Sequence, residues 1–169
     1  DVKGIWKQFE ESGYYYAFQS YDWLHQWYRS FGTPSVQLCF VLIEKSAGKP
    51  ILFLPFCIQE KCGIKILSWL GSHVTDYHCP LLMENLSSEW YENFTVLWEQ
   101  IKLRLQPYDV LHLEKQPEYV RGLKNPFVQY SNVGSYAKSD FIQMEGDWKT
   151  FYQNNVKKQF KQYKCYNNS

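Results

Sequence analysis

Three apolar, β-rich segments, separated only by short polar breaks, constrain the fold of this chain more than any other feature. The segments are SVQLCFVLIE, KPILFLPFCIQ and GIKILSWLG, and the breaks between them are SAGK and EKCG, over residues 35–71. Breaks of this length join antiparallel neighbours, because a crossover between parallel strands needs a dozen or more residues. The sequence therefore predicts an antiparallel meander of three strands. Pro55 lacks a backbone N–H, which predicts a bulge or an edge position in the second strand.

Two amphipathic helices with marked ends accompany these strands. In FQSYDWLHQWYRSFG, Ser20 is placed to cap the N-terminus, and Gly32 fits the left-handed position just past the C-terminus. The apolar face of this helix recurs at helical spacing and contains Trp23, Leu24, Trp27, Tyr28 and Phe31. A second helix is predicted over residues 88–106, because its apolar residues follow the helical period and Pro107 ends it.

The remaining segments complete a mixed architecture. Residues 108–116, YDVLHLEKQ, predict a short strand of the kind that is buried in a sheet covered on both faces. Residues 117–136 are rich in loop-forming residues, 139–145 predict a strand, and 146–166 predict a final helix capped by Asp147. No repeat, linker or low-complexity tract divides the chain. We therefore expect a single α/β domain of mixed α+β type, with helices flanking a largely antiparallel central sheet.

Composition narrows the class of protein. Hydrophobic residues make up 45% of the 169 residues, which argues against a disordered chain. Aromatic residues make up 19%, which fits either a thick core or a ligand-binding groove, and the core is the simpler interpretation. The formal net charge of +1 gives no electrostatic reason to expect nucleic acid as a partner.

The five cysteines favour a reduced, cytoplasmic location over a disulfide framework. They form no CxxC pair, their number is odd, and Cys39 and Cys57 lie inside apolar runs. No membrane span and no signal peptide is visible in the sequence. The chain begins at Asp1 rather than at Met, so the removal of a targeting segment stays an open alternative.

Candidate chemistry concentrates in one polar stretch, SWLGSHVTDYHCP, at residues 68–80. His73, Asp76, His78 and Cys79 are residue types that bind metals. The two histidines lie five residues apart without the HExxH pattern, and no second Cys/His cluster follows at zinc-finger spacing. The sequence therefore does not predict a metal site.

Asp76, Tyr77 and His78 are the candidate catalytic residues of this stretch. Cys79 beside His78 suggests a nucleophile and its base, but neighbours in an extended segment point to opposite faces, which favours a packed cysteine. Asp76 can accept a proton or a hydrogen bond from a substrate, and Tyr77 can donate one. The structural alternative is a turn in which Asp76 bonds to the backbone and Tyr77 is half-buried, and residue types alone favour that alternative.

The C-terminal segment is rich in lysine and has no acidic residue after Asp147. Its lysines are Lys149, Lys157, Lys158, Lys161 and Lys164. Three interpretations stay open for them. They are a solvated face that complements the helix dipole, a surface for anionic lipid or nucleic acid, and a contact with the phosphates of a ligand such as CoA.

The order of several motifs along the chain carries a family resemblance. The motifs are the FQS…W helix start, the WLG…DY segment, VLHLEKQPE, NPF and the closing W…KKQFK helix, and they cover about residues 16–163. In this order and spacing they resemble the N-terminal part of the CelD-like acyltransferases, which are named for an association with cellulose biosynthesis. Those proteins belong to the GNAT superfamily and are related to the FemAB-type transferases.

The resemblance implies a GNAT-like fold and the transfer of an acyl group from acyl-CoA, such as acetyl-CoA, to an amine or a hydroxyl. The acceptor would be a small molecule, a sugar or a peptide, with polysaccharide biosynthesis as the implied context. Asp76 and Tyr77 correspond to the family's DY pair, and His78 beside them is a further group that can assist the acceptor. Under this interpretation the candidate contacts of the CoA phosphates are Lys157, Lys158 and Lys161.

One element expected of such an enzyme is missing from the sequence. A glycine-containing pyrophosphate loop, roughly Q/R-x-x-G-x-G/A at a helix start, would supply backbone N–H groups to the phosphates, and the sequence around Gly122 lacks that pattern. In the family the acyl-CoA-binding half follows the lysine-rich helix, where this chain ends. We therefore expect an N-terminal half-domain that is inactive alone and is completed by the C-terminal half of the same protein. The rival hypotheses are a non-catalytic module that binds carbohydrate or peptide, and a surface-associating domain.

Overall fold

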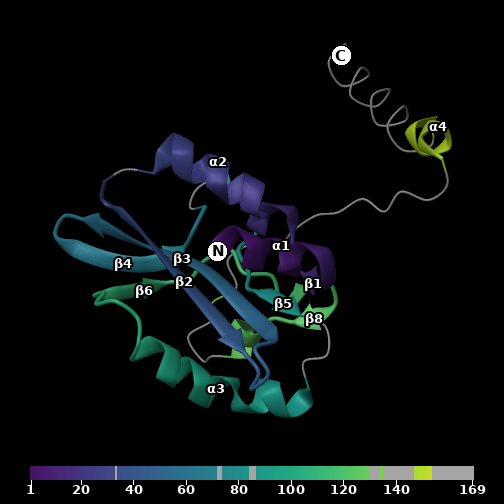
Figure 1. The fold of residues 1–169 in the computed structure, drawn as a ribbon. Helices are drawn as coiled ribbons and strands as arrows, with labels where there is room; N and C mark the ends of the chain where they lie inside the picture. Colours follow the sequence, from purple (N-terminus) through teal and green to yellow (C-terminus); the bar gives the residue numbers. More distant parts are fainter. Residues whose placement is uncertain (33, 72–73, 84–86, 130–133, 135–146, 154–169) are drawn as a thin grey trace. The chain divides into compact units, whose positions relative to one another are not determined.

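A computed structural model describes residues 1–32, 34–71, 74–83, 87–129, 134 and 147–153 (Figure 1). The chain divides into two compact units, Asp1–Ser135 and Tyr136–Ser169. Among the helices that the described residues form, none combines the length and the apolar character that a membrane crossing requires.

A mixed, largely antiparallel sheet forms the centre of the first unit. Its strands are β1 (Gly13–Tyr14), β2 (Val36–Glu44), β3 (Pro50–Lys61), β4 (Ile64–Trp69), β5 (Leu81–Met83) and β6 (Val110–His112). Every pair of neighbours is antiparallel except β4 and β6, which are parallel. The predicted meander is confirmed as β2, β3 and β4. The broader prediction of a mixed α+β fold with a largely antiparallel sheet is confirmed with it.

The sheet forks along β3, at Pro55. One edge of β3 pairs with β2, whereas on the other edge Leu52 and Phe53 pair with β5 and Phe56–Lys61 pair with β4. Pro55 lies between these two stretches, and its carbonyl accepts a hydrogen bond from the Leu70 N–H at 2.8 Å. The missing N–H of proline therefore falls at the fork, where no ladder partner needs it. The predicted bulge or edge position is wrong, because β3 is a central strand with continuous register to β2 at this point.

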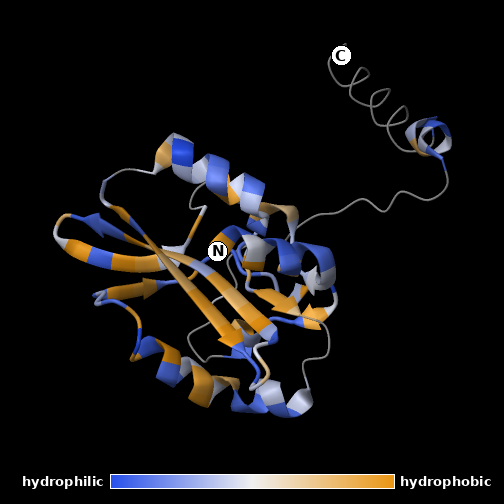
Figure 2. Ribbon diagram, viewed as in Figure 1, coloured by the Kyte–Doolittle hydropathy of each residue, from blue (hydrophilic) through white to orange (hydrophobic). Residues whose placement is uncertain are grey.

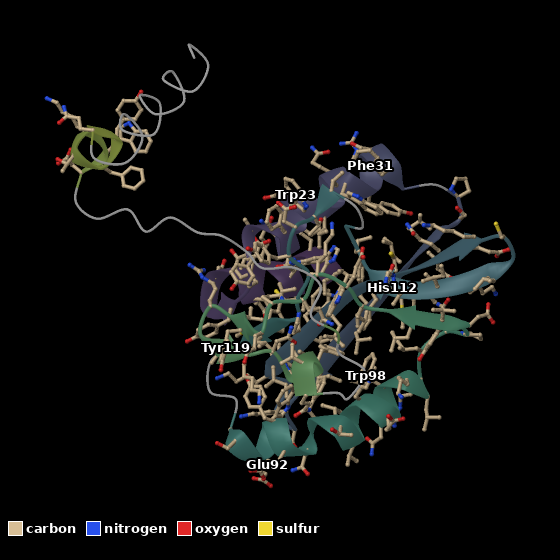
Figure 3. The ribbon with its side chains drawn as sticks, turned by 180° about the vertical axis from the view of Figure 1, so that it is seen from behind. Trp23, Phe31, Glu92, Trp98, His112 and Tyr119 are labelled. Atoms are coloured by element: carbon tan, nitrogen blue, oxygen red, sulfur yellow. The ribbon has the colours of Figure 1, made fainter. Side chains whose placement is uncertain are left out.

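Helices cover both faces of the sheet (Figure 1). Helices α1 (Val2–Ser12) and α2 (Tyr21–Phe31) lie on one face, and α3 (Ser88–Lys102) lies on the other. The strands between them are the most hydrophobic part of the ribbon (Figure 2). On α3, Trp98 points toward the sheet and Glu92 points away from it (Figure 3). The core accordingly forms two clusters, one around Phe56 and Trp98 on the α3 side and one around Trp6 on the other.

The first predicted helix begins and ends where expected, but not with the expected C-terminal geometry. The Ser20 hydroxyl accepts a hydrogen bond from the Trp23 N–H at 3.4 Å, so the predicted N-cap is confirmed. Gly32 has φ −63°, so the prediction of a left-handed glycine is wrong. Its N–H instead donates to the Tyr28 carbonyl at 2.7 Å. A Cβ at Gly32 would collide with that carbonyl and with the Tyr28 ring, so close approach explains the glycine.

Helix α1 at the N-terminus was not predicted from the sequence. Asp1 caps it, accepting a hydrogen bond from the Lys3 N–H at 3.1 Å, and Trp6 and Phe9 are its buried residues. A short 3-10 helix, η1 (Ala17–Gln19), then leads into α2.

The second predicted helix is confirmed as α3 with an earlier end. Ser87 caps its N-terminus, where its hydroxyl accepts a hydrogen bond from the Trp90 N–H at 3.2 Å. The helix ends at Lys102, and Leu105 N–H still donates to the Ile101 carbonyl at 3.1 Å in the turns that follow.

The strand predicted over residues 108–116 is much shorter and is not buried. It is β6, which pairs with β4 in the described part of the chain and has all three residues exposed. Its position at the edge of the sheet explains the exposure, and the prediction of a strand covered on both faces is wrong.

The segment 117–136, expected to be loop-rich, contains short regular elements. A hairpin pairs β7 (Tyr119–Val120) with β8 (Leu123–Lys124), and the 3-10 helix η3 (Pro126–Gln129) follows. Arg121 and Gly122 both have positive φ between the two strands, so Gly122 belongs to a tight hairpin turn.

The second unit is described over residues 147–153. Asp147 accepts a hydrogen bond from the Thr150 N–H at 3.1 Å and caps α4 (Trp148–Phe151), so the predicted cap is confirmed. The predicted strand 139–145 and the later part of the predicted helix lie outside the described residues.

Candidate functional site

Residues 70–80 of the polar stretch connect β4 and β5, the two branches of the forked sheet. It leaves β4 after Trp69, and Pro80 leads into β5. Gly71 makes the first bend with φ +112°, and its carbonyl accepts a hydrogen bond from the Thr75 hydroxyl at 3.2 Å. A Cβ at Gly71 would lie 2.6 Å from Thr75 Oγ1 and 2.9 Å from Leu24 Cδ2, so the bend requires glycine.

Gln19 binds this stretch to the helix start that precedes α2. Its side chain is buried, and its Nε2 donates to the Tyr77 carbonyl. Its Oε1 accepts from the Cys79 thiol at 3.0 Å and from the Tyr16 N–H at 3.3 Å. The FQS and DY motifs of the sequence are therefore joined by hydrogen bonds and form one structural unit.

Lys115 holds the same stretch from the other side. Its carbonyl accepts a hydrogen bond from the His78 N–H at 3.0 Å, and its Nζ donates to the Thr75 carbonyl at 2.9 Å. Lys115 has φ +54°, in the left-handed region that a lysine rarely adopts. This unfavourable conformation occurs where the segment after β6 contacts the polar stretch.

Asp76 and Tyr77, the two sequence candidates of the DY pair, lie on the outside of this stretch. The Asp76 side chain is exposed and makes no hydrogen bond to any described residue. Tyr77 is half-buried, and its ring stacks on Tyr16 with 5.4 Å between centroids. The turn in which Asp76 would bond to the backbone is therefore not observed, whereas the half-buried Tyr77 is.

Substitution of Asp76 is expected to leave stability unchanged. Because its carboxylate bonds to no described residue, Asp76→Asn and Asp76→Ala should each shift the free energy of unfolding by less than about 0.5 kcal/mol. Urea denaturation of the two variants measures this. A loss of about 1 kcal/mol in Asp76→Ala alone would show that the carboxylate caps a turn after all.

His78 differs from its neighbours because it is buried, with 2% of its surface exposed. Its Nδ1 lies 3.4 Å from the Glu114 carbonyl, which can only accept, so we assign the ring proton to Nδ1. Its Nε2 is buried and has no hydrogen-bond partner among the described residues. Burial, aided by the nearby Lys115 charge, lowers the pKa of His78 from 6.5 to about 4, against a smaller opposing effect of the Glu114 carbonyl. The imidazole is therefore neutral at pH 7, with a free lone pair on Nε2.

A cavity of about 220 Å³ lies beside His78. Its lining residues are Gln59, Lys61, Ile66, Ser68, Trp69, His78, His112 and Glu114. Ser68 pairs with Cys57 on one side and with His112 on the other, so these three residues lie on the same face of the sheet. Cys57 belongs to the core cluster of α1 and α2, which places the cavity on that face. Figure 3 shows where His112 lies on β6.

The thiol of Cys79 is not a nucleophile in this arrangement. Cys79 is fully buried, and burial raises its pKa to about 12, against a smaller opposing effect of the Tyr16 backbone. The thiol therefore stays protonated at neutral pH, and it donates to Gln19 rather than meeting His78. The prediction of a packed cysteine agrees with this geometry.

Four of the remaining candidate residues fall outside what the structure describes. His73 and the lysines assigned to acyl-CoA, Lys157, Lys158 and Lys161, all lie in segments that are not described. Within the described ranges, no three His, Cys, Asp or Glu side chains come close enough together to hold a metal ion.

Sequence reasoning missed His112 and Glu114 as members of the site. Both belong to the predicted strand 108–116, more than 30 residues after His78, and were interpreted only as part of that strand. The alternation of His112 and Glu114 is a detectable signal, because residues two apart in an extended segment share a face. The parallel pairing of β6 with β4, which brings them to His78, has no signal in the sequence.

Comparison with known proteins found no matching family model, no matching curated protein and no matching solved structure.

Proposed function

We propose that this chain is the acceptor-binding part of an acyltransferase with a GNAT-like fold, as its resemblance to the CelD-like proteins implies. The acceptor, an amine or a hydroxyl compound, would bind in the cavity beside His78. Of the three sequence candidates, His78 is then the residue that contacts the acceptor. Asp76, which is exposed, and Tyr77, which is half-buried against Tyr16, would not contact it.

The observation that supports the proposal is the unpartnered Nε2 of His78. A buried polar atom without a partner costs stability, so its retention beside a cavity favours a ligand that completes its hydrogen bonding. Because the neutral imidazole carries its proton on Nδ1, Nε2 accepts a hydrogen bond. The bound group therefore has to be a donor, as the hydroxyl and amine acceptors of acyl transfer are.

The turn at Gly122 does not fit the phosphates of acyl-CoA. Gly122, the glycine considered above for a pyrophosphate loop, lies in the tight turn between β7 and β8 rather than at a helix start. A phosphate-binding loop needs backbone N–H groups that converge at a helix N-terminus, which this hairpin turn does not provide. In our proposal the acyl donor is held by residues outside the described ranges, and we derive no reaction step for it.

Thiol release by the natural protein that carries these 169 residues tests the proposal. Incubated with acetyl-CoA and a panel of small amines and alcohols, it should release free CoA only when a suitable acceptor is present. His78→Asn keeps a donor near the Nδ1 position and removes Nε2, so it should lower acceptor-dependent release at least tenfold while the protein stays folded. Asp76→Asn is the matched control and should retain most of the activity.

A non-catalytic binding module is the second candidate, and an aromatic cluster favours it. Tyr16 stacks on Tyr77, and Phe18 packs against Trp23 at 5.3 Å and near Tyr77 at 6.2 Å. Trp23 is 40% exposed, and the exposed Asp76 neighbours Tyr77, so the cluster offers flat rings beside a carboxylate to a sugar or a peptide. Acceptor binding without thiol release under any condition would favour this candidate.

A further inference from the structure

Strand β2 forms one edge of the sheet among the described strands. It pairs with β3 over its whole length, and no described strand pairs with its other side. Natural proteins ordinarily protect such edges with charged residues, prolines or bulges, because unpaired backbone groups bind other strands. β2 contains no proline and no basic residue, and its bulge and its one acidic residue both lie at its end, at Ile43 and Glu44. The edge is therefore long and regular and lacks these protections.

The hydrogen bond at Pro55 shows which backbone groups of β2 point outward. The Pro55 carbonyl accepts from the Leu70 N–H, on the side of β3 that faces away from β2. The residue opposite Pro55 therefore belongs to a pair without ladder hydrogen bonds, because the N–H and C=O of one residue point to the same side. That residue is Phe40, and the alternation extends to Leu38 and Leu42. The backbone groups of these three residues point to the outer edge, where no backbone hydrogen bond from a described loop reaches them.

The side chains along this edge are apolar on both faces of the sheet. Residues 40–43 are four consecutive half-buried apolar residues, and Leu38 is 36% exposed. An added strand would cover these side chains on both faces while it bonds to the outward backbone groups. The partner that fits this edge is therefore an extended, apolar strand.

We infer that β2 pairs antiparallel with β2 of a second copy of this chain, about a two-fold axis at Phe40, so that the two sheets become continuous. The inference is independent of the proposed function. A strand that pairs with its own copy about a two-fold axis has to run antiparallel to it. An axis at Phe40 pairs all nine residues of the strand, whereas an axis at a neighbouring residue pairs fewer.

The sequence of β2 is complementary to itself in this register. Leu38 lies opposite Leu42 of the partner subunit, so apolar side chains face each other on the α1 and α2 side. Glu44 lies opposite Val36 of the partner subunit, which places the two carboxylates at opposite ends of the paired strands. Apolar residues therefore meet at the centre and like charges do not meet, which favours a second copy as the occupant.

The mass of the natural protein that carries these residues tests the inference. Light scattering after gel filtration, at micromolar concentrations, should give twice the mass of one chain. Leu38→Lys should raise the dissociation constant of this dimer at least tenfold, because it places a charge among the apolar side chains of the interface. Val96→Lys is the matched control: Val96 is 61% exposed on α3, so the same charge there should leave the dimer unchanged. Circular dichroism verifies that both variants are folded.

Cross-linking tests the register. Cys39 lies opposite Val41 of the partner subunit in a pair without hydrogen bonds, whose Cα atoms are about 4.5 Å apart, close enough for a disulfide. Val41→Cys, oxidised with glutathione disulfide, should therefore form a covalent dimer. Gln37→Cys, opposite Ile43 of the partner subunit, should cross-link no more than the original protein, which is the reference for links through other cysteines.

Each contrary result overturns a defined part of the inference. A monomeric mass throughout the micromolar range would overturn the dimer. A dimer that persists unchanged in Leu38→Lys would overturn its assignment to β2, because the interface would then lie on another surface. Cross-linking of Gln37→Cys but not of Val41→Cys would overturn the two-fold axis at Phe40.

Discussion

Replacing Phe127 with alanine is expected to lower the free energy of unfolding by about 3–5 kcal/mol. Phe127 is 3% exposed and lies in η3, a 3-10 helix of four residues. Its ring contacts an aromatic group drawn from three different elements, with centroid distances between 5.1 and 6.5 Å. The members of that group are Phe56, Trp69, Phe94 and Trp98. Truncation would leave a cavity between the sheet and α3 that the rigid neighbouring rings cannot fill.

Urea denaturation of Phe127→Ala measures this loss, with Leu103→Ala as the control. Leu103 is 87% exposed just past the end of α3, so its truncation should change the free energy of unfolding by less than about 0.5 kcal/mol. If Phe127→Ala is too unstable to purify, Phe127→Leu, which conserves most of the volume, should show a smaller loss in the same direction. A loss below about 1 kcal/mol in Phe127→Ala would show that η3 does not complete the core.

Phe127 also illustrates which parts of the fold the sequence could predict. The meander and helices α2 and α3 were predicted because each has at least six residues of regular periodicity and flanking turn or cap residues. The elements between residues 117 and 129 have two to four residues each, which is too few for a period to show. Their positions are set by burial of Val120 and Phe127 against residues far away in sequence. Tertiary packing, rather than local propensity, forms them.

The candidate site was predicted only in part, for a related reason. The stretch 68–80 was identified from its residue types, but residue types do not show which neighbour faces inward. Asp76 is exposed and His78 is buried because the Lys115 carbonyl and the Gln19 side chain fix the orientation of the stretch. Both partners come from segments that are distant in sequence. Residue types pointed first to Asp76 as the site residue, whereas burial points to His78. This difference is a consequence of tertiary hydrogen bonds.

Acidification is expected to destabilise the protein through His78. The folded-state pKa of His78 is about 4, below the ordinary value of 6.5 that applies to the unfolded chain. The unfolded state therefore binds the proton more tightly, and the stability associated with neutral His78 is fully present above pH 6.5 and falls as the pH drops toward 4. The difference in pKa corresponds to about 3 kcal/mol over this interval, with a slope of up to about 1.4 kcal/mol per pH unit.

The difference in unfolding free energy between the original protein and His78→Asn isolates the contribution of His78. Carboxylates also titrate below pH 5, but they do so in both proteins, so their effect cancels when the two unfolding free energies are subtracted at each pH. We expect urea denaturation at pH 7.5, 6.5, 5.5 and 4.5 to show the original protein losing stability relative to the variant at each step below pH 6.5. Parallel curves would show that His78 titrates normally and is not buried. The same burial bears on the cavity: because the imidazole stays neutral down to about pH 4, Nε2 remains a hydrogen-bond acceptor throughout the physiological range.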